Sequence, residues 1–174
     1  KKLWAEGLKE EGKTKLTLEL LGDDTEGAKK YQEYLQNQLE KNLPGLEVSI
    51  ASVPFKTRLS RSENGDFDMV GTAWIGDFPD TITFLDLLTS NNTYNNGKWS
   101  NKEYDALIEK SKTTDATDPE KRWQDLVDAS DVLNKTMGAI PVYQSVEAHL
   151  VNSKIKDLKY SPAGNYDFVN AYLK

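Results

Sequence analysis

The sequence has 174 residues, the length of one ordinary domain, with 22 Lys and Arg against 28 Asp and Glu and a net charge of −6. This acidic balance argues against nucleic-acid binding, because neutralising phosphates requires a basic stripe that the sequence lacks. Cysteine is absent and histidine occurs only as His149, which excludes disulfide scaffolds, thiol nucleophiles, Cys-ligated zinc and two-histidine zinc sites.

The first half of the chain predicts alternating helices and strands. Residues 1–12 predict a helix ending at Gly12, and leucines alternate with polar residues over 15–22, which is the period of a strand. The next helix is capped at Asp24 or Thr25, and Pro44-Gly45 stops it. Its apolar stripe is Ala28, Tyr31, Leu35 and Leu39. Because 46–53 predicts a second strand after this long helix, we expect a right-handed crossover between parallel strands.

A short helix after Pro54 precedes a third predicted strand over 67–74, whose small and apolar residues predict burial on both faces. Residues 82–88 predict a short apolar helix. The Asn-rich loop 89–98 is predicted to be mobile.

Two capping boxes, starting at Ser100 and Thr117, predict two further helices, the second ending at Gly138. The apolar face expected for the second helix is Trp123, Leu126, Val127, Ser130 and Leu133. Short strands are predicted over 139–145, 148–153 and 167–173. The fold class is therefore α/β, with a mainly parallel three-stranded core and antiparallel additions.

Few residues are placed for chemistry. His149 is interpreted as a structural or exposed residue rather than a catalytic one. The sequence has no glycine-rich loop of the kind that binds phosphate. Carboxylate pairs such as Asp66 with Asp68, or Asp77 with Asp80, resemble those of glycosidases, but 28 acidic residues make such pairs common. Asp77 has the strongest position, because ligands of open α/β sheets bind beyond the carboxyl ends of the strands. Two structural interpretations stay open. Asp77 could only brace the turn, and Trp74 could be a core residue that closes the end of the sheet.

The stretch Trp74-Ile75-Gly76-Asp77-Phe78-Pro79-Asp80, followed by Phe84-Leu85, resembles the solute-binding proteins of bacterial ABC importers for oligopeptides, family 5 of the extracellular solute-binding proteins. The resemblance continues through YDALI at 104–108, DPEKR at 118–122 and IPVY at 140–143. Each motif is weak alone, but their order and spacing are specific, and they cover nearly the whole chain.

The resemblance implies a periplasmic-binding-protein-like type II lobe with a mixed, mainly parallel sheet flanked by helices. Residues 1–174 would then be a single C-terminal lobe of a two-lobed receptor whose N-terminal lobe is missing, with about 154–174 belonging with that missing lobe. The receptor would capture extended oligopeptides between its lobes, without catalysis, cofactor or metal. Asp77 would receive the peptide's N-terminal ammonium, and the peptide-binding residues around it would be Trp74, Ile75, Gly76 and Phe78.

The same resemblance implies ABC permease subunits as partners, and a location on the extracellular face of the bacterial cell membrane or in the periplasm. A lipid anchor outside this chain would supply membrane association, since no run approaches the ~18 apolar residues of a membrane span. The chain starts without an initiator Met or signal peptide, so we expect a fragment or processed piece.

Three alternatives stay open. The first is a receptor of the same fold for another solute, such as a nickel chelate, a sugar or a pheromone peptide. The second is a hydrolase that uses paired carboxylates. The third is a module that holds unfolded peptides without requiring a free N-terminus.

Overall fold

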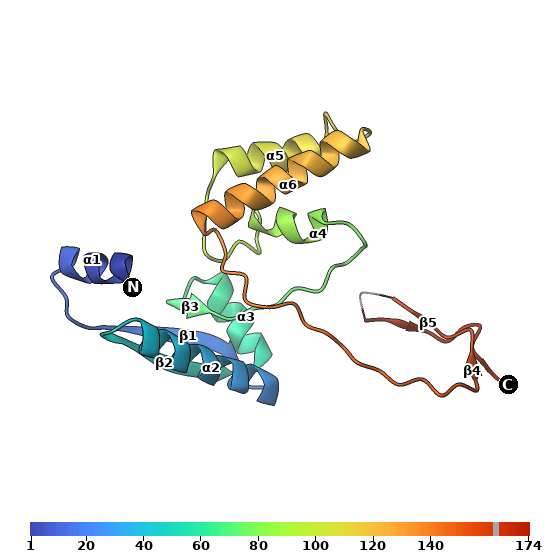
Figure 1. Ribbon diagram of the computed structural model, residues 1–174, viewed down its shortest axis with the longest axis horizontal. Helices are drawn as coiled ribbons and strands as arrows, with labels where there is room; N and C mark the ends of the chain where they lie inside the picture. Colours follow the sequence, from blue (N-terminus) through green and yellow to red (C-terminus); the bar gives the residue numbers. More distant parts are fainter. Residues whose placement is uncertain (162–163) are drawn as a thin grey trace. The chain divides into compact units, whose positions relative to one another are not determined.

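The computed structural model describes residues 1–161 and 164–174, and the chain divides into two units, 1–73 and 74–174 (Figure 1). The first unit contains α1 (Lys2–Glu10), β1 (Leu16–Asp23), α2 (Glu26–Asn42), β2 (Leu46–Val53), α3 (Phe55–Glu63) and β3 (Met69–Val70). The second contains α4 (Ile82–Leu85), the 3₁₀ turn η1 (Asp86–Leu88), α5 (Lys102–Lys112), α6 (Pro119–Thr136), β4 (Ile155–Lys156), β5 (Lys159–Tyr160), β6 (Tyr166–Asp167) and β7 (Tyr172–Leu173).

A three-stranded parallel sheet in the order β2-β1-β3 forms the centre of the first unit. β1 and β2 are paired in parallel from Leu16 with Leu46 to Asp23 with Val53, which confirms the predicted crossover. The N-cap of α2 is Thr25, whose hydroxyl accepts a hydrogen bond from the Ala28 N–H at 3.3 Å. The core of this unit comprises Leu20, Leu46 and Val48, packed against Trp4, Leu18, Leu35, Leu39, Leu43 and Met69.

The third strand is much shorter than the predicted 67–74. Only Met69 and Val70 are paired with β1, and both are half-buried rather than buried on both faces. One further hydrogen bond runs from the Gly71 N–H to the Leu21 carbonyl at 2.9 Å. Because β1 ends two residues beyond Leu21, the chain has few partner groups left and leaves the sheet.

The helices α5 and α6 pack side by side in the second unit, with α4 against α6 (Figure 1). Their shared core is Leu85, Tyr104, Ile108, Leu126 and Ala129. Both helices begin one residue later than their capping boxes predict. Asn101 rather than Ser100 caps α5, accepting from the N–H groups of Glu103 and Tyr104, and Asp118 rather than Thr117 caps α6. The asparagine and aspartate side chains are strong caps, so they compete effectively with Ser and Thr.

Two details of α6 differ from the sequence pattern. Trp123, expected on the apolar face, is 59% exposed, while Leu126 and Ala129 are buried. Met137 rather than a glycine takes the left-handed conformation after the helix, with φ of 53°. The next residue, Gly138, packs against the Trp99 ring and has no room for a side chain, because a Cβ there would be 2.6 Å from Cδ2 of Trp99.

The strands predicted over 139–145 and 148–153 are wrong, because the structure has no strand between residues 139 and 153. Apolar side chains in this segment, including Ile140, Val146 and Leu150, are exposed, and none of the described strands pairs with it to supply main-chain hydrogen-bond partners. Over 167–173 only short strands form: β4 is antiparallel to β7, and β5 to β6. None of the described helices combines the length and the apolar character needed to cross a membrane.

Candidate functional site

The turn over residues 74–80 carries the predicted site residues, and it lies close to α4. A Cβ on Gly76 would be 3.0 Å from Cγ2 of Thr83 and 3.2 Å from the ring of Phe84, so glycine permits this approach. The main-chain N–H of Asp77 donates to Oγ1 of the buried Thr83 at 3.0 Å. The main chain of the turn is therefore attached to α4, while the Asp77 side chain is exposed.

Asp80, at the end of the same turn, has a structural role. Its Oδ1 accepts from the Ile82 N–H at 2.9 Å, and Nη2 of Arg122 contacts Oδ1 at 3.0 Å and Oδ2 at 2.9 Å. The hydrogen bond from Arg122 is the main reason that the pKa of Asp80 lies below its usual value. Asp80 thus joins the start of α4 to α6.

A cavity of 540 Å³ lies beside this turn. Its lining residues are Trp74, Asp77, Phe78, Ile82, Thr83, Asp86, Leu87, Asn92, Tyr94, Ser111, Lys112, Ala116 and Arg122. Three predicted site residues, Trp74, Asp77 and Phe78, are therefore brought together. Ile75 and Gly76 do not line the cavity, and the Ile75 side chain is 72% exposed.

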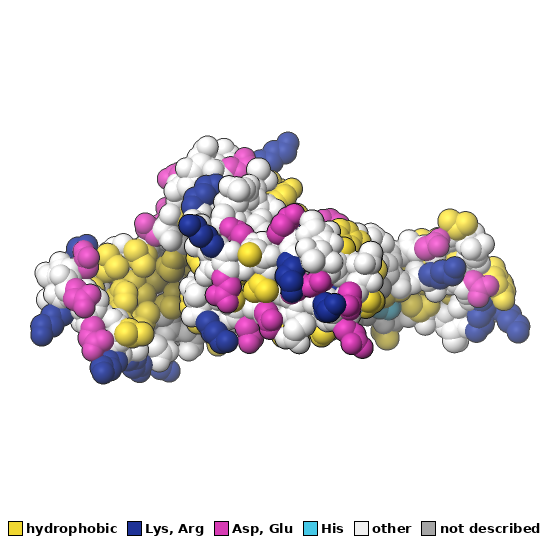
Figure 2. Space-filling model, turned by 90° about the horizontal axis from the view of Figure 1, so that it is seen from above, with side chains coloured by type: hydrophobic (Ala, Val, Ile, Leu, Met, Phe, Trp, Pro, Cys, Tyr) yellow, Lys and Arg dark blue, Asp and Glu magenta, His cyan; other side chains and the backbone are white. Residues whose placement is uncertain are grey.

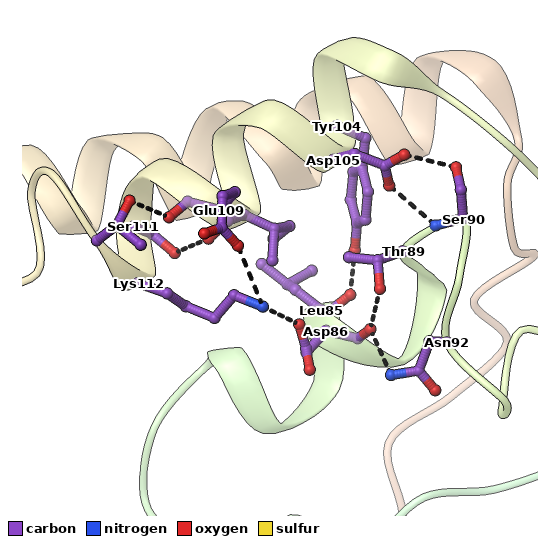
Figure 3. A network of polar contacts seen from close by, with 12 residues as sticks. Leu85, Asp86, Thr89, Ser90, Asn92, Tyr104, Asp105, Glu109, Ser111 and Lys112 are labelled. Carbon is purple, nitrogen blue, oxygen red and sulfur yellow. Dashed lines mark hydrogen bonds and ion pairs between the residues drawn. The ribbon is translucent and has the colours of Figure 1, made fainter.

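The charged groups of the cavity differ in whether they already have partners. Nζ of Lys112 lies 2.8 Å from Oδ1 of Asp86 and 3.9 Å from Oε2 of Glu109 (Figure 3). Arg122 is paired with Asp80. Among the described residues, no hydrogen bond or ion pair engages the Asp77 carboxylate. Asp77 is thus the carboxylate in the cavity that is open to a cation.

The Asn-rich loop 89–98, which the sequence predicts to be mobile, forms one wall of the cavity, and its side chains make hydrogen bonds that fasten it. Asn92 Nδ2 donates to the Asp86 carbonyl at 2.9 Å, and Ser90 binds the Asp105 carboxylate through its N–H and its hydroxyl (Figure 3). Asn95 is buried and bonded to the main chain of Thr89 and Trp99. The loop is therefore an ordered wall of the site, held by its own hydrogen bonds.

Beneath this wall, the buried Tyr104 on α5 donates its hydroxyl to the Leu85 carbonyl (Figure 3). Burial raises the pKa of this phenol above its usual value, so the hydroxyl stays a donor at neutral pH. The bond ties the end of α4, which borders the cavity, to α5.

Sequence reasoning missed most of the cavity, including Asn92, Tyr94, Lys112 and Arg122. These residues come from the loop, α5 and α6, and only tertiary packing brings them to the turn. The density of asparagines over 89–98 was the available signal, because asparagine side chains often bond to nearby main-chain groups.

The first unit has a hollow of its own. In the first unit, hydrophobic side chains gather near α1 (Figure 2), where a hollow of 270 Å³ is lined by Leu3, Trp4, Gly7, Leu8, Glu11, Lys13 and Leu16. Most of the side chains that line this hollow are apolar, as in a packing surface. Within the described part of the chain, no group of three His, Cys, Asp or Glu residues is placed to hold a metal ion.

Sequence comparison relates the chain to known solute-binding proteins. The model of the bacterial extracellular solute-binding proteins, family 5 Middle, matches residues 1–96. The chain is 40% identical to the dipeptide-binding protein of Lactococcus lactis subsp. cremoris (strain MG1363), over all of this chain and 32% of that protein. It is 28% identical to the oligopeptide-binding protein OppA of Bacillus subtilis (strain 168), over 97% of this chain and 31% of that protein.

Solved structures agree with this relationship. Listeria monocytogenes OppA bound to peptide superposes with a TM-score of 0.83 and 38% identity, covering 99% of this chain and 33% of that one. The substrate-binding domain of an oligopeptide ABC transporter from Bacillus anthracis str. Ames gives a TM-score of 0.85 and 34% identity, covering 98% and 33%. The chain thus spans about a third of the length of these relatives.

Proposed function

The chain belongs to family 5 of the bacterial extracellular solute-binding proteins, and we propose that it is part of the peptide-binding component of an ABC importer. Its mixed α/β fold, with a parallel sheet and helices, is that of the type II periplasmic binding proteins. A peptide ligand is supported by the dipeptide-binding Lactococcus relative and by the peptide-bound Listeria structure. These relatives are solute-binding proteins rather than enzymes, so the proposed role is capture without turnover.

In this proposal the Asp77 carboxylate receives the N-terminal ammonium of the peptide. The observation that carries it is the contrast among the acidic residues of the turn and cavity. Asp80 is bound by Arg122 and Asp86 by Lys112, whereas Asp77 is exposed and, among the described residues, no cationic side chain is paired with its carboxylate. A charge-assisted bond to an ammonium would satisfy it.

This chemistry would tolerate many peptide sequences. Every unmodified peptide has an N-terminal ammonium and the same main-chain groups, so a site that binds those groups recognises the class rather than one member. The cavity beside Asp77 would receive side chains, and the open Ile75 and the small Gly76 would allow the peptide main chain to approach the turn.

The chain would supply one wall of the binding cleft. It spans about a third of the length of its relatives, and we propose that 1–174 is a C-terminal lobe whose partner lobe lies elsewhere in the full-length protein. The segment from about 154 to 174 would pack with that other lobe. Its short strands β4 to β7 pair with one another, and many of its apolar side chains, such as Phe168 and Val169, are exposed.

The partners would be the permease subunits of the importer, and the place of action would be the extracellular face of the cell membrane or the periplasm. The family name supports an extracellular or periplasmic role. A lipid anchor outside this chain would hold the receptor near the permease.

A hydrolase with paired carboxylates is not favoured, because the other candidate acids have structural partners. Asp66 is paired with Arg61 at 2.8 Å, and Asp68 accepts from the Glu19 N–H at 2.8 Å. Asp80 is held by Arg122. Neither carboxylate pair therefore has two members without structural partners, as a general acid and a general base would require.

Calorimetric titration of the full-length receptor tests the role of Asp77. The ligand is Phe-Ala-Ala with a free N-terminus, compared with its N-acetylated form. An ammonium–carboxylate contact has a net value of roughly 1.5–3 kcal/mol, so Asp77→Asn should lower affinity by roughly 10- to 150-fold. N-acetylation should cause a similar loss with the unmodified receptor, and the two losses should not add, because both remove one contact.

The matched control is Asp66→Asn, a carboxylate of the first unit that lies outside the cavity and pairs with Arg61. It should leave affinity within about twofold, as a surface substitution away from the site does. Equal binding of free and N-acetylated peptide by the unmodified receptor would show that Asp77 only braces the turn.

A further inference from the structure

Tyr94 is the one aromatic residue in the polar loop 89–98, and its ring lies against Trp74. The ring centroids are 4.8 Å apart and the planes meet at 63°, an edge-to-face arrangement that aromatic pairs favour. Both residues line the 540 Å³ cavity, yet Tyr94 remains 58% exposed. The loop thus presents apolar surface to the cavity that the fold itself does not cover.

The main chain on both sides of Tyr94 is fastened. Before it, Oδ1 of Asn92 accepts from the Tyr94 N–H at 2.9 Å, while Nδ2 of Asn92 donates to the Asp86 carbonyl at 2.9 Å. After it, the buried Asn95 donates to the Trp99 carbonyl at 2.7 Å and accepts from the Trp99 N–H at 3.2 Å. The ring is therefore positioned before a ligand arrives, which reduces the entropy lost on binding.

The rest of the cavity lining is suited to an apolar side chain. The apolar residues around Tyr94 in this lining are Trp74, Phe78, Ile82, Leu87 and Ala116. Asp77 lines the same cavity. In a peptide, the first side chain and the N-terminal ammonium are attached to the same carbon atom. The first side chain of a peptide whose ammonium is bound by Asp77 is therefore within reach of these apolar residues.

We propose that Tyr94, together with Trp74, is a specificity-determining residue that selects peptides with a bulky apolar first side chain. This inference rests on the proposed peptide-binding function. The proposed function alone gives no preference among first residues, because contact with the ammonium and main chain treats them alike. The inference adds a preference at the first position of the peptide. Asn92 and Asn95 are positioning residues, because they hold the loop and do not need to touch the ligand.

The experiment compares Phe-Ala-Ala with Ala-Ala-Ala by calorimetric titration of the full-length receptor. The unmodified receptor should bind Phe-Ala-Ala at least tenfold more tightly, since an enclosed aromatic side chain removes much apolar area from water. Tyr94→Ala should reduce this affinity ratio about tenfold through weaker binding of Phe-Ala-Ala. Binding of Ala-Ala-Ala should change by less than about twofold. Tyr94→Phe keeps the ring and should keep the ratio.

Trp123→Ala is the matched control, because Trp123 is an aromatic residue with 59% exposure that does not line the cavity. It should leave the ratio unchanged. The inference is overturned if Tyr94→Ala leaves the ratio unchanged, or weakens both peptides equally. Equal binding of free and N-acetylated Phe-Ala-Ala would refute the role of Asp77 and leave the Tyr94 ratio to be judged separately. Failure of both tripeptides to bind would overturn both proposals.

Discussion

Replacing Asn95 with alanine should destabilise the chain strongly, although Asn95 lies in a loop. Its side chain is 1% exposed and makes three hydrogen bonds to main-chain groups, at 3.2 Å to the Thr89 carbonyl, 2.7 Å to the Trp99 carbonyl and 3.2 Å from the Trp99 N–H. Asn95→Ala removes all three. The Thr89 carbonyl keeps a second donor, the Asn92 N–H at 3.0 Å, so the two groups of Trp99 bear most of the loss.

A buried polar group left without its partner costs about 1–3 kcal/mol, and Trp99 is half-buried, which places each of its two groups at the lower end. The expected fall in unfolding free energy is therefore about 2–3 kcal/mol. Urea unfolding followed by far-ultraviolet circular dichroism measures it as a shift of the midpoint. Asn91→Ala, at an exposed position of the same loop, should stay within about 0.5 kcal/mol of the unmodified chain. A fall below about 0.5 kcal/mol for Asn95→Ala would refute the reasoning that Asn95 fastens the loop.

Three further predictions follow from the same structure. Gly138→Ala places a Cβ 2.6 Å from Cδ2 of Trp99 and should lower the unfolding free energy by about 1–3 kcal/mol, whereas Met137→Gly, at a φ of 53°, should raise it by about 0.5–1 kcal/mol; urea midpoints that move in the same direction would contradict this contrast. The lowered pKa of Asp80 means that its pairing with Arg122 stabilises the fold fully above the unfolded pKa of about 3.9 and is lost as the pH falls through the lower folded pKa. Arg122→Met should therefore reduce the drop in stability between pH 6 and pH 3, and an unchanged drop would count against the pairing. The isolated chain should bind Phe-Ala-Ala with a Kd of about 1 mM, because it forms one wall of the proposed cleft, and micromolar binding in a calorimetric titration would contradict that division of the site.

The parts of the fold that could be predicted are those set by neighbouring residues. The alternating leucines of β1, the apolar stripe of α2 and the stop at Pro44-Gly45 all act within one or two turns of chain, and the parallel pairing with β2 follows from them. The cap positions were one residue off, because Asn101 and Asp118 compete with adjacent Ser and Thr for the same N–H groups.

The predicted strands that failed depended on a distant partner. Residues 139–145 have strand composition, but a strand needs a neighbouring edge, and none of the described strands pairs with this segment. The 67–74 strand is shortened at its start, where the Asp68 side chain rather than the main chain accepts from the Glu19 N–H, and at its end, where β1 stops at Asp23. In the loop 89–98, which was predicted only as a polar, mobile segment, Asn95 has main-chain partners that only the folded loop brings within reach.

The candidate site divides in the same way. Trp74, Asp77 and Phe78 could be predicted together because they are adjacent in a turn that follows a strand. Lys112, Arg122 and Tyr94 could not, since α5, α6 and the loop bring them to the cavity from far along the chain. Which carboxylate is open to a ligand also depended on those residues, because Arg122 is what distinguishes Asp80 from Asp77.

The four tryptophans lie in different environments, so the fluorescence of each would report on a different part of the protein. Trp4 donates its indole N–H to the Pro44 carbonyl in the first unit, and Trp99 meets Tyr104 edge-on in the second. Trp123 is mostly in water, so its emission should be red-shifted and should change little on unfolding. Trp74 lines the cavity, so a chain that retains only this tryptophan would report occupancy of the cavity by fluorescence, without a label.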